Sequence, residues 1–491
     1  MHIHPSTIAA ACLSLLPLAS SFYPYNPIYT DVPTRRSPDR SLHRVSRPLD
    51  PRGHSYSLPI RRTPTKRTNK YNIITATPPT QSNSIAVDQD GTDFSYMVAV
   101  TFGTSSEEYH MLVDSAASNT WVMGSNCTTD ACKEHNTFGK GDSTSLIISD
   151  TTFSIAYGTG QVSGNLATDT FHIAGFNLPL TFGLANNVSN DFGSYPMDGI
   201  LGLGRGDSTS NTIAAPSLMD VLSSKSLIKS KLFGIHLSRT SSGVNDGELD
   251  FGAPNLGRYD GALNYIPTIS NTDGFWEIAA DDAGVDGKKL GLTSRSAIID
   301  TGTSFILMPN DDAVALHKLI PGFTQGGETF TVPCSSTQVV QLVLGGVTYN
   351  VSAADYIGHS LGGGACASNI IGRQTFGPTQ WLVGDVFLKN VYTVFDFDSS
   401  RLGFGVKGQV NTASATTLTA VPFSTTPLVS GSSTILSKSS PPTGTTAPTP
   451  ASQQLPGASA SPTHSVAAAG CASSGAMLAL SMAFFIPAIF L

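Results

Sequence analysis

Positive charge is scarce in the central part of this chain of 491 residues. Charged residues make up 13% of the sequence, and residues 71–410 hold 16 basic and 32 acidic residues, a net charge of −16. Proteins that bind nucleic acids carry a basic patch or stripe on their surface. The composition therefore argues against a nucleic-acid partner.

Two hydrolase signatures are also missing or incomplete. The sequence lacks the His-Glu-x-x-His pattern of zinc proteases, so we expect neither a metal nor another cofactor. Gly358-His359-Ser360-Leu361-Gly362 fits the Gly-x-Ser-x-Gly elbow of esterases, but glycines follow it instead of a helix. Because the only later histidine is His464, the Ser–Asp–His order has no usable base. We therefore reject the esterase interpretation.

Cysteine is rare, with six residues in the whole chain. Two of them, Cys12 and Cys471, lie in the apolar stretches at the ends. An even number in the body of a secreted protein suggests two disulfides. Spacing alone leaves three connectivities, of which we favour the local one: Cys127 with Cys132, and Cys334 with Cys366.

The start of the chain predicts a secreted precursor. Residues 1–20 are interpreted as a secretory signal, because an apolar run ends in small residues. Residues 21–67 are rich in Pro, Arg and Ser, and two dibasic pairs close this region, Arg61-Arg62 and Lys66-Arg67. We interpret residues 21–67 as a basic propeptide cut by a secretory processing protease. A basic disordered linker is the alternative.

The end of the chain resembles the tail of a surface protein. Residues 409–466 consist mostly of Ser, Thr, Pro, Ala and Gly, which suits an O-glycosylated stalk. Residues 467–491 run from small residues into a terminal apolar stretch, as in the signal for a glycolipid (GPI) anchor. The alternative is a tail-type transmembrane helix. We expect a protein delivered through the secretory pathway to the cell surface and held at the membrane by a glycolipid.

Between these ends the chain is expected to be rich in β-strands. β-Branched, aromatic and other apolar residues favour strands, and Gly, Asn, Asp and Ser separate them. Helical signals are few, at residues 217–227 and 312–319. The predicted strands include Tyr96–Phe102 and residues 152–157, 297–299, 339–344 and 392–397.

Two runs carry the chemistry. His110-Met111-Leu112-Val113-Asp114-Ser115 and Ala297-Ile298-Ile299-Asp300-Thr301-Gly302 each deliver an aspartate from an apolar strand into a turn of small residues. Each is followed downstream by an apolar-apolar-Gly run, at residues 199–202 and 381–384. This repetition suggests two related lobes that meet at a cleft.

These motifs identify residues 92–408 as similar to the pepsin-type aspartic proteases. The resemblance implies an all-β fold with few short helices, in which the cleft lies between an N-terminal lobe (68–245) and a C-terminal lobe (246–408). It implies catalytic aspartates at Asp114 and Asp300 and one loop disulfide per lobe. Tyr157, Gly158 and Thr159 correspond to the flap over the substrate, and Trp121 to the residue that hydrogen-bonds the flap tyrosine. Supporting positions are Ser115, Thr301, Gly302 and Thr303.

Two carboxyl groups suit the hydrolysis of a peptide bond, because two carboxyls a few ångströms apart cannot both ionise easily. The ionised member takes a proton from water, and the protonated member donates to the scissile carbonyl. The chain departs from the family at Ala116 and Ala117. Ala117 removes a hydroxyl that would support Asp114, which favours a less acidic pH optimum than serine would give. Ala116 replaces a glycine and fits only where φ is negative.

We therefore expect a secreted aspartic endopeptidase, made as a zymogen, that acts on proteins and peptides. The same fold used only for binding, with a decayed site, is the alternative. The basic propeptide is expected to dock on the acidic body as an intramolecular inhibitor, and the enzyme is expected to be a monomer. Secretion makes N-glycosylation plausible at three sequons, although these can also arise by chance: Asn126, Asn187 and Asn350.

Overall fold

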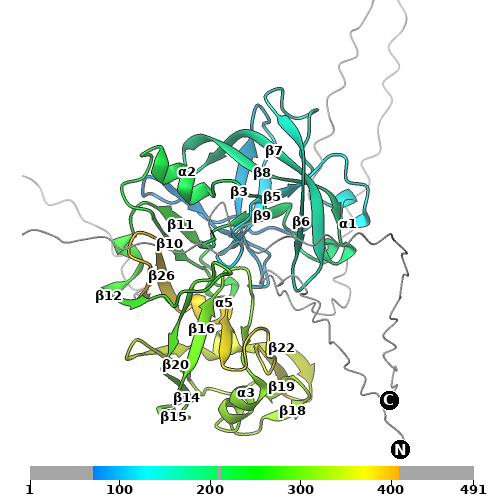
Figure 1. Cartoon of the computed structure of the whole chain (residues 1–491). Helices are drawn as coiled ribbons and strands as arrows, with labels where there is room; N and C mark the ends of the chain where they lie inside the picture. Colours follow the sequence, from blue (N-terminus) through cyan, green and yellow to red (C-terminus); the bar gives the residue numbers. More distant parts are fainter. Residues whose placement is uncertain (1–69, 207–211, 408–491) are drawn as a thin grey trace, which may run out of the picture. The chain divides into compact units, whose positions relative to one another are not determined.

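The described part of the chain is built from five β-sheets. The structure is a computed structural model, and it describes residues 70–206 and 212–407. The predicted signal, propeptide, stalk and anchor signal fall outside these residues. In Figure 1 the strands from β3 to β9 gather in one lobe, and those from β14 to β22 gather in another. This arrangement agrees with the predicted two-lobed β-rich fold.

The first lobe contains an eight-stranded sheet. Its strands β3 and β7 also pair with each other, so the sheet folds back on itself. In β7, buried side chains mostly alternate with more exposed ones, as expected for a strand with one face in the core. The strand order is β2 (Asp88–Gln89), β3 (Tyr96–Phe102), β4 (Tyr109–Asp114), β9 (Gly199–Gly202), β5 (Trp121–Met123), β8 (Phe176–Val188), β7 (Gln161–Ile173) and β6 (Ile147–Ala156).

A cluster of aromatic rings fills the core of this lobe. The Phe102 ring lies 5.1 Å from the Phe138 ring, 5.1 Å from Phe171 and 4.8 Å from Phe182, measured between centroids. All four side chains are fully buried. Because burying one such side chain contributes about 1.5–3 kcal/mol, this cluster is a major source of stability for the sheet that carries Asp114.

The second lobe contains a five-stranded and two four-stranded sheets. The five-stranded sheet has the order β13 (Glu277–Ala280), β16 (Arg295–Ile299), β25 (Gln380–Val383), β17 (Ile306–Leu307) and β24 (Ile370–Ile371). One four-stranded sheet has the order β15 (Lys288–Lys289), β14 (Asp282–Val285), β20 (Val340–Leu344) and β21 (Val347–Val351). The other has the order β18 (Thr324–Gly326), β19 (Thr329–Pro333), β23 (Ala365–Ser368) and β22 (Ile357–Gly362).

The repetition seen in the sequence is also present in the strand pairing. In the first lobe, β4 runs parallel to β9, β9 antiparallel to β5, and β5 parallel to β8. In the second lobe, β16, β25, β17 and β24 repeat this series of directions. Each aspartate lies at the end of the first strand in its series, so both occupy equivalent places.

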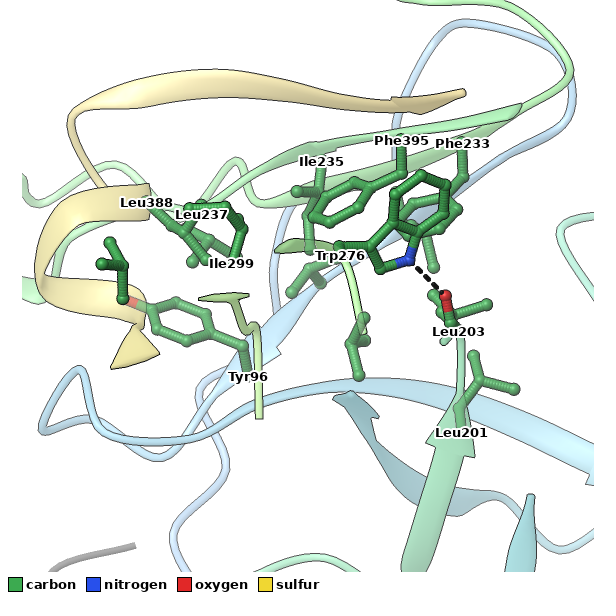
Figure 2. Packing of buried hydrophobic residues seen from close by; sticks show 14 of the residues in the cluster. Tyr96, Leu201, Leu203, Phe233, Ile235, Leu237, Trp276, Ile299, Leu388 and Phe395 are labelled. Carbon is green, nitrogen blue, oxygen red and sulfur yellow. Dashed lines mark hydrogen bonds between the residues drawn. The ribbon is translucent and has the colours of Figure 1, made fainter. Parts of the chain in front are cut away.

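A six-stranded sheet combines strands from distant parts of the chain. Trp276 packs on it: its ring meets Phe233 and Phe395 edge-on, and its Nε1 donates a 3.0 Å hydrogen bond to the Leu203 carbonyl (Figure 2). This contact links the segment after β9 to the second half of the chain. The order is β1 (Ser84–Ala86), β11 (Glu248–Phe251), β10 (Leu232–His236), β26 (Val391–Asp396), β27 (Arg401–Val406) and β12 (Asp260–Pro267).

Helices are short throughout the described residues. The expected helix at 217–227 is confirmed as α2, which begins with reciprocal capping bonds between Ser217 and Asp220. None of the helices within 70–206 and 212–407 is long and apolar enough to cross a membrane. The helical segments are α1 (Asp130–Lys133), η1 (Asn190–Ser194), α2 (Leu218–Ser224), η2 (Thr240–Ser242), η3 (Leu256–Arg258), α3 (Asn310–His317), α4 (Ala353–Tyr356) and α5 (Asp385–Leu388).

The other element predictions hold to within a few residues. The strand predicted at Tyr96–Phe102 is β3, and those at 339–344 and 392–397 are β20 and β26. The helix predicted at 312–319 is α3, displaced by two residues toward the N-terminus. The strand predicted at 152–157 is the second half of a longer strand, β6, which ends at Ala156 and leaves Tyr157 in the following turn.

Candidate active site

The structure brings the two aspartate loops together. Asp114 ends β4 and Asp300 follows β16 directly, and both side chains are fully buried. The second loop crosses the first carboxyl so closely that a Cβ on Gly302 would lie 2.6 Å from Cγ of Asp114. A glycine is therefore required at position 302, since any side chain there would collide with the dyad.

Reciprocal hydrogen bonds lock the two loops to each other. Ser115 Oγ donates to the Ile299 carbonyl at 2.9 Å and accepts from the Thr301 amide at 3.0 Å. Thr301 Oγ1 donates to the Val113 carbonyl at 2.7 Å and accepts from the Ser115 amide at 2.9 Å. Each hydroxyl thus satisfies two buried backbone groups of the opposite lobe. Loss of a hydroxyl would remove the hydrogen bonds that it makes to those two backbone groups.

The two carboxyl groups have different hydrogen-bond partners. Asp114 Oδ1 accepts from the Ala116 and Ala117 amides at 2.9 and 2.8 Å, whereas Asp114 Oδ2 accepts no hydrogen bond from an amide or hydroxyl of the described residues, and the Asp114 carboxyl interacts with that of Asp300. Asp300 Oδ1 accepts from the Gly302 amide at 2.8 Å, and Asp300 Oδ2 accepts from Thr303 Oγ1 at 2.6 Å. The hydroxyl that Ala117 lacks is therefore present only on the Asp300 side.

Ala116 fits the first loop without backbone strain. It is not among the residues of the described chain that have positive φ, which meets the condition set by the sequence. Its side chain is buried in an apolar cluster with Phe275, Phe305 and Ile298 from the second lobe. The extra methyl group therefore adds apolar contact between the lobes.

Burial and mutual repulsion disfavour a second charge in this site. Removal from water raises the pKa of Asp114 well above its usual range, and the neighbouring Asp300 carboxyl raises it further. The amides of Ala116 and Ala117 oppose this shift only in part. The pair of carboxyls is therefore favoured with one proton retained under conditions in which an exposed aspartate would have lost it.

Tyr157, predicted to be the flap tyrosine, is hydrogen-bonded by Trp121, the residue that the resemblance pairs with it. Trp121 Nε1 donates a 2.8 Å hydrogen bond to Tyr157 Oη, and both side chains are buried. Gly158 and Thr159 lie in the turn between β6 and β7, which the Tyr157 amide closes by donating to the Gly160 carbonyl at 2.7 Å. The turn is thus anchored on the same lobe as Asp114.

Two residues of the site were not singled out from the sequence. Phe192, in η1, packs edge-on against Trp121 and Tyr157, with centroid distances of 5.7 and 6.0 Å. No spacing rule marks it, because η1 is distant from both partners in the sequence. Asp385 is fully buried close to Asp300, and its amide donates to the Thr303 carbonyl at 2.8 Å. Its signal was available, since it directly follows the second apolar-apolar-Gly run.

Burial raises the pKa of Asp385 well above its usual range, and repulsion from Asp300 contributes to this shift. Lys389 opposes it but does not reverse it. Asp385, a third carboxyl near the dyad, is therefore favoured in its neutral form. This avoids further negative charge close to Asp300.

The remaining sequence candidates are resolved as follows. The disulfides have the favoured local pairing, Cys127–Cys132 and Cys334–Cys366. Ser360 lies in β22 of an exposed hairpin rather than at a strand-to-helix turn, which agrees with rejection of the esterase interpretation. The described residues contain no cluster of His, Cys, Asp and Glu that could hold a metal ion. The three sequon asparagines, Asn126, Asn187 and Asn350, are exposed.

Comparison with known proteins agrees with this geometry. The sequence model of the family described as eukaryotic aspartyl protease matches residues 95–407, so the chain belongs to that family of aspartic endopeptidases. It is 44% identical over 370 residues to the aspartic-type endopeptidase ctsD of Aspergillus fumigatus, covering 75% of this chain and 77% of the relative. It is 45% identical over 362 residues to the probable aspartic-type endopeptidase CTSD of Trichophyton verrucosum, covering 73% and 70%. It is 31% identical over 347 residues to pepsin A of Suncus murinus, covering 68% and 88%.

Proposed function

We propose that this endopeptidase cleaves its substrates with Asp114 and Asp300 as the catalytic dyad. The observation that carries the assignment is the reciprocal bonding of Ser115 and Thr301, which fixes the two aspartate loops against each other. Such a rigid pair of buried carboxyls can hold one shared proton and activate one water molecule.

The different surroundings of the two carboxyls suggest their roles. Asp300 accepts a hydrogen bond from a hydroxyl, which stabilises its ionised form, so it is the member that takes a proton from water. Asp114 Oδ2 lacks an amide or hydroxyl donor and the pKa of Asp114 is raised, so it is the member that donates a proton to the carbonyl oxygen of the scissile bond. The proton is nevertheless a property of the pair, and its two ionisations are macroscopic.

The substrate is an extended peptide that lies between the dyad and the flap. Tyr157, Gly158 and Thr159 would cover it and exclude water from the reacting atoms. Trp121 and Phe192 are buried against Tyr157 and support the flap turn from below the surface. As the family resemblance implies, apolar side chains are preferred next to the cut bond. This preference follows from the burial of apolar surface and leaves the natural substrate open.

We also propose a zymogen that ends at the cell surface. The basic segment 21–67 before an acidic body supports docking of the propeptide as an intramolecular inhibitor. The uncharged stalk and the apolar tail support attachment by a glycolipid anchor, and the exposed Asn126, Asn187 and Asn350 are available for glycosylation. A monomeric enzyme completes this proposal.

Cleavage of a denatured protein at acidic pH tests the catalytic assignment. Purified protein should cleave it, a statine-type inhibitor should block cleavage, and Asp300→Ala should abolish it while retaining the thermal unfolding midpoint. The absence of inhibitor-sensitive cleavage across the acidic range would overturn the assignment. The remaining explanation would be a surface protein that uses the fold only for binding, with Ala116 and Ala117 as marks of a decayed site.

A further inference from the structure

An ordered segment precedes the part of the chain that the family accounts for. Residues 70–77, which we call the N-terminal strap, lie before the matched region at 95–407 and begin three positions after the dibasic pair Lys66-Arg67. Ile74 exchanges backbone hydrogen bonds of 2.8 and 3.1 Å with Gln89, and the Thr77 amide donates to the Asn245 carbonyl at 2.7 Å. The strap is therefore an integral part of the first lobe.

The strap is anchored to the lobe at both of its ends. Ala76 is almost fully buried, and its amide donates to Asp88 Oδ1 at 2.8 Å. At the other end, Lys70 pairs with Glu134 on the surface. Between these points, Ile73 packs against the apolar cluster that contains Trp121 and Tyr157.

Tyr71 makes the most specific contact of the strap. Its ring stacks on His135 with 5.0 Å between centroids, and its hydroxyl donates to the Gly193 carbonyl. Burial raises the pKa of Tyr71, and the Glu134 carboxylate, which also hydrogen-bonds the Tyr71 hydroxyl, raises it further, so the phenol keeps its proton. His135 is itself buried, with its ring nitrogens 2.6 Å from the carbonyls of Ala131 and Tyr195.

These contacts place Tyr71 next to the support of the flap. Gly193 belongs to η1 and directly follows Phe192, whose ring packs edge-on against both Trp121 and Tyr157. Tyr195, whose carbonyl meets His135, follows the last residue of η1. The strap thus holds the short helical segment against which the flap tyrosine rests.

We propose that Tyr71 is a positioning residue for the flap, which it acts on through η1 and Phe192. The inference rests on the proposed function, since it concerns how that site holds its substrate. It also implies that processing after Arg67 leaves the strap on the mature enzyme, because removal of residues 70–77 would release η1. Substrate affinity would then depend on a residue outside the region that the family model matches.

Amide hydrogen exchange of the full-length protein gives the most direct test. Tyr71→Phe keeps the ring on His135 but removes the donor to Gly193, and Tyr71→Ala removes both contacts. Peptides that cover η1 and the turn at 157–160 should exchange faster in Tyr71→Phe and faster still in Tyr71→Ala. Tyr356→Phe is the matched control, because Tyr356 Oη donates to the Gln338 carbonyl at 2.9 Å in the second lobe.

Peptidase kinetics give the second measurement. Tyr71→Phe should raise KM by about fivefold, the equivalent of one net hydrogen bond, with little change in kcat. Tyr71→Ala should raise KM and the inhibition constant of a statine-type inhibitor further. Titration with that inhibitor corrects for any inactive fraction, so a variant that merely folds poorly is recognised.

Unchanged exchange at η1 and the flap turn in Tyr71→Phe and Tyr71→Ala would overturn the proposal, and so would an effect equal to that of Tyr356→Phe. If N-terminal sequencing shows that the mature enzyme begins after residue 77, the proposal is also overturned. Hydrogen exchange is measured without substrate. It therefore tests the strap even if the purified protein cleaves no peptide, which would count against the proposed function alone.

Discussion

Restoring the missing hydroxyl at position 117 should move one side of the pH–rate profile. In Ala117→Ser we expect the new Oγ to reach Asp114 Oδ2, which is buried and accepts no hydrogen bond from an amide or hydroxyl of the described residues. The mirror-related pair in the second lobe shows the geometry, with Thr303 Oγ1 2.6 Å from Asp300 Oδ2. A hydroxyl donor stabilises the ionised form of Asp114, so its pKa falls.

The size of the effect follows from the strength of such a bond. A hydrogen bond to a charged group contributes about 1.5–3 kcal/mol, and one pKa unit corresponds to about 1.4 kcal/mol. Because two amides already donate to Asp114 Oδ1, we expect the lower end of this range, a fall of about one unit. In the proposed assignment Asp114 carries the shared proton, so the new hydroxyl should act on the second ionisation of the pair, which sets the alkaline side of the profile.

The assay is kcat/KM of a soluble peptide between pH 2 and 8, which reports the free enzyme. In Ala117→Ser the alkaline side should move to lower pH by about one unit, while the acidic side stays in place. Thr303→Val is the mirror control: it removes the donor to Asp300 and should move the acidic side to higher pH. A shift of the acidic side alone in Ala117→Ser would show that Asp114 ionises first, and an unchanged curve would show that the missing hydroxyl does not tune the dyad. Either result refutes the reasoning.

Two further predictions concern stability. Burial raises the pKa of Asp198 to about 7, so its contribution is present below its unfolded pKa and is lost as the pH rises through 7. Between pH 4 and 7.5 the free energy of unfolding of the wild type should fall by on the order of 4 kcal/mol because of this group, and that of Asp198→Asn should fall much less. Thermal unfolding midpoints across that range measure the difference, and equal slopes for the two proteins would contradict the prediction. Ser115→Ala removes the hydrogen bonds to the Ile299 carbonyl and from the Thr301 amide, and it should lower the free energy of unfolding, measured with denaturant, by about 2–5 kcal/mol. Ser115→Thr keeps both bonds and should change this free energy little. A small loss in Ser115→Ala would show that the lobes do not depend on these bonds.

Local features of the sequence were sufficient for several parts of the fold. The strand at Tyr96–Phe102 was predictable from its β-branched, aromatic and other apolar residues, and α2 from a local helical signal, because both depend on near neighbours in the sequence. The pairing of Cys127 with Cys132 was also favoured locally, since they are only five positions apart in the sequence. The strand at 152–157 was predicted too short, because the first half of β6 is mostly exposed and has little apolar signal.

Distant contacts could not be predicted in this way. Phe192 lies far in the sequence from Trp121 and Tyr157, and no periodicity relates the three rings. The strap was assigned to the first lobe by its position alone, and its stacking on His135 depends on the course of the chain through α1 and η1. Asp385 was overlooked although it adjoins a recognised motif, because its burial beside Asp300 arises only when the second lobe folds.

The sequence by itself determined the identity of the two aspartates and the departure at Ala116 and Ala117, because these depend on residue type and order. Only the tertiary structure decided what the departure does. It placed Ala116 in an apolar contact between the lobes. It also left Asp114 Oδ2 without an amide or hydroxyl donor, whereas Asp300 accepts a hydrogen bond from the Thr303 hydroxyl. The physical reason is that the ionisation of a buried carboxyl is set by the groups around it, and folding brings those groups from both halves of the chain.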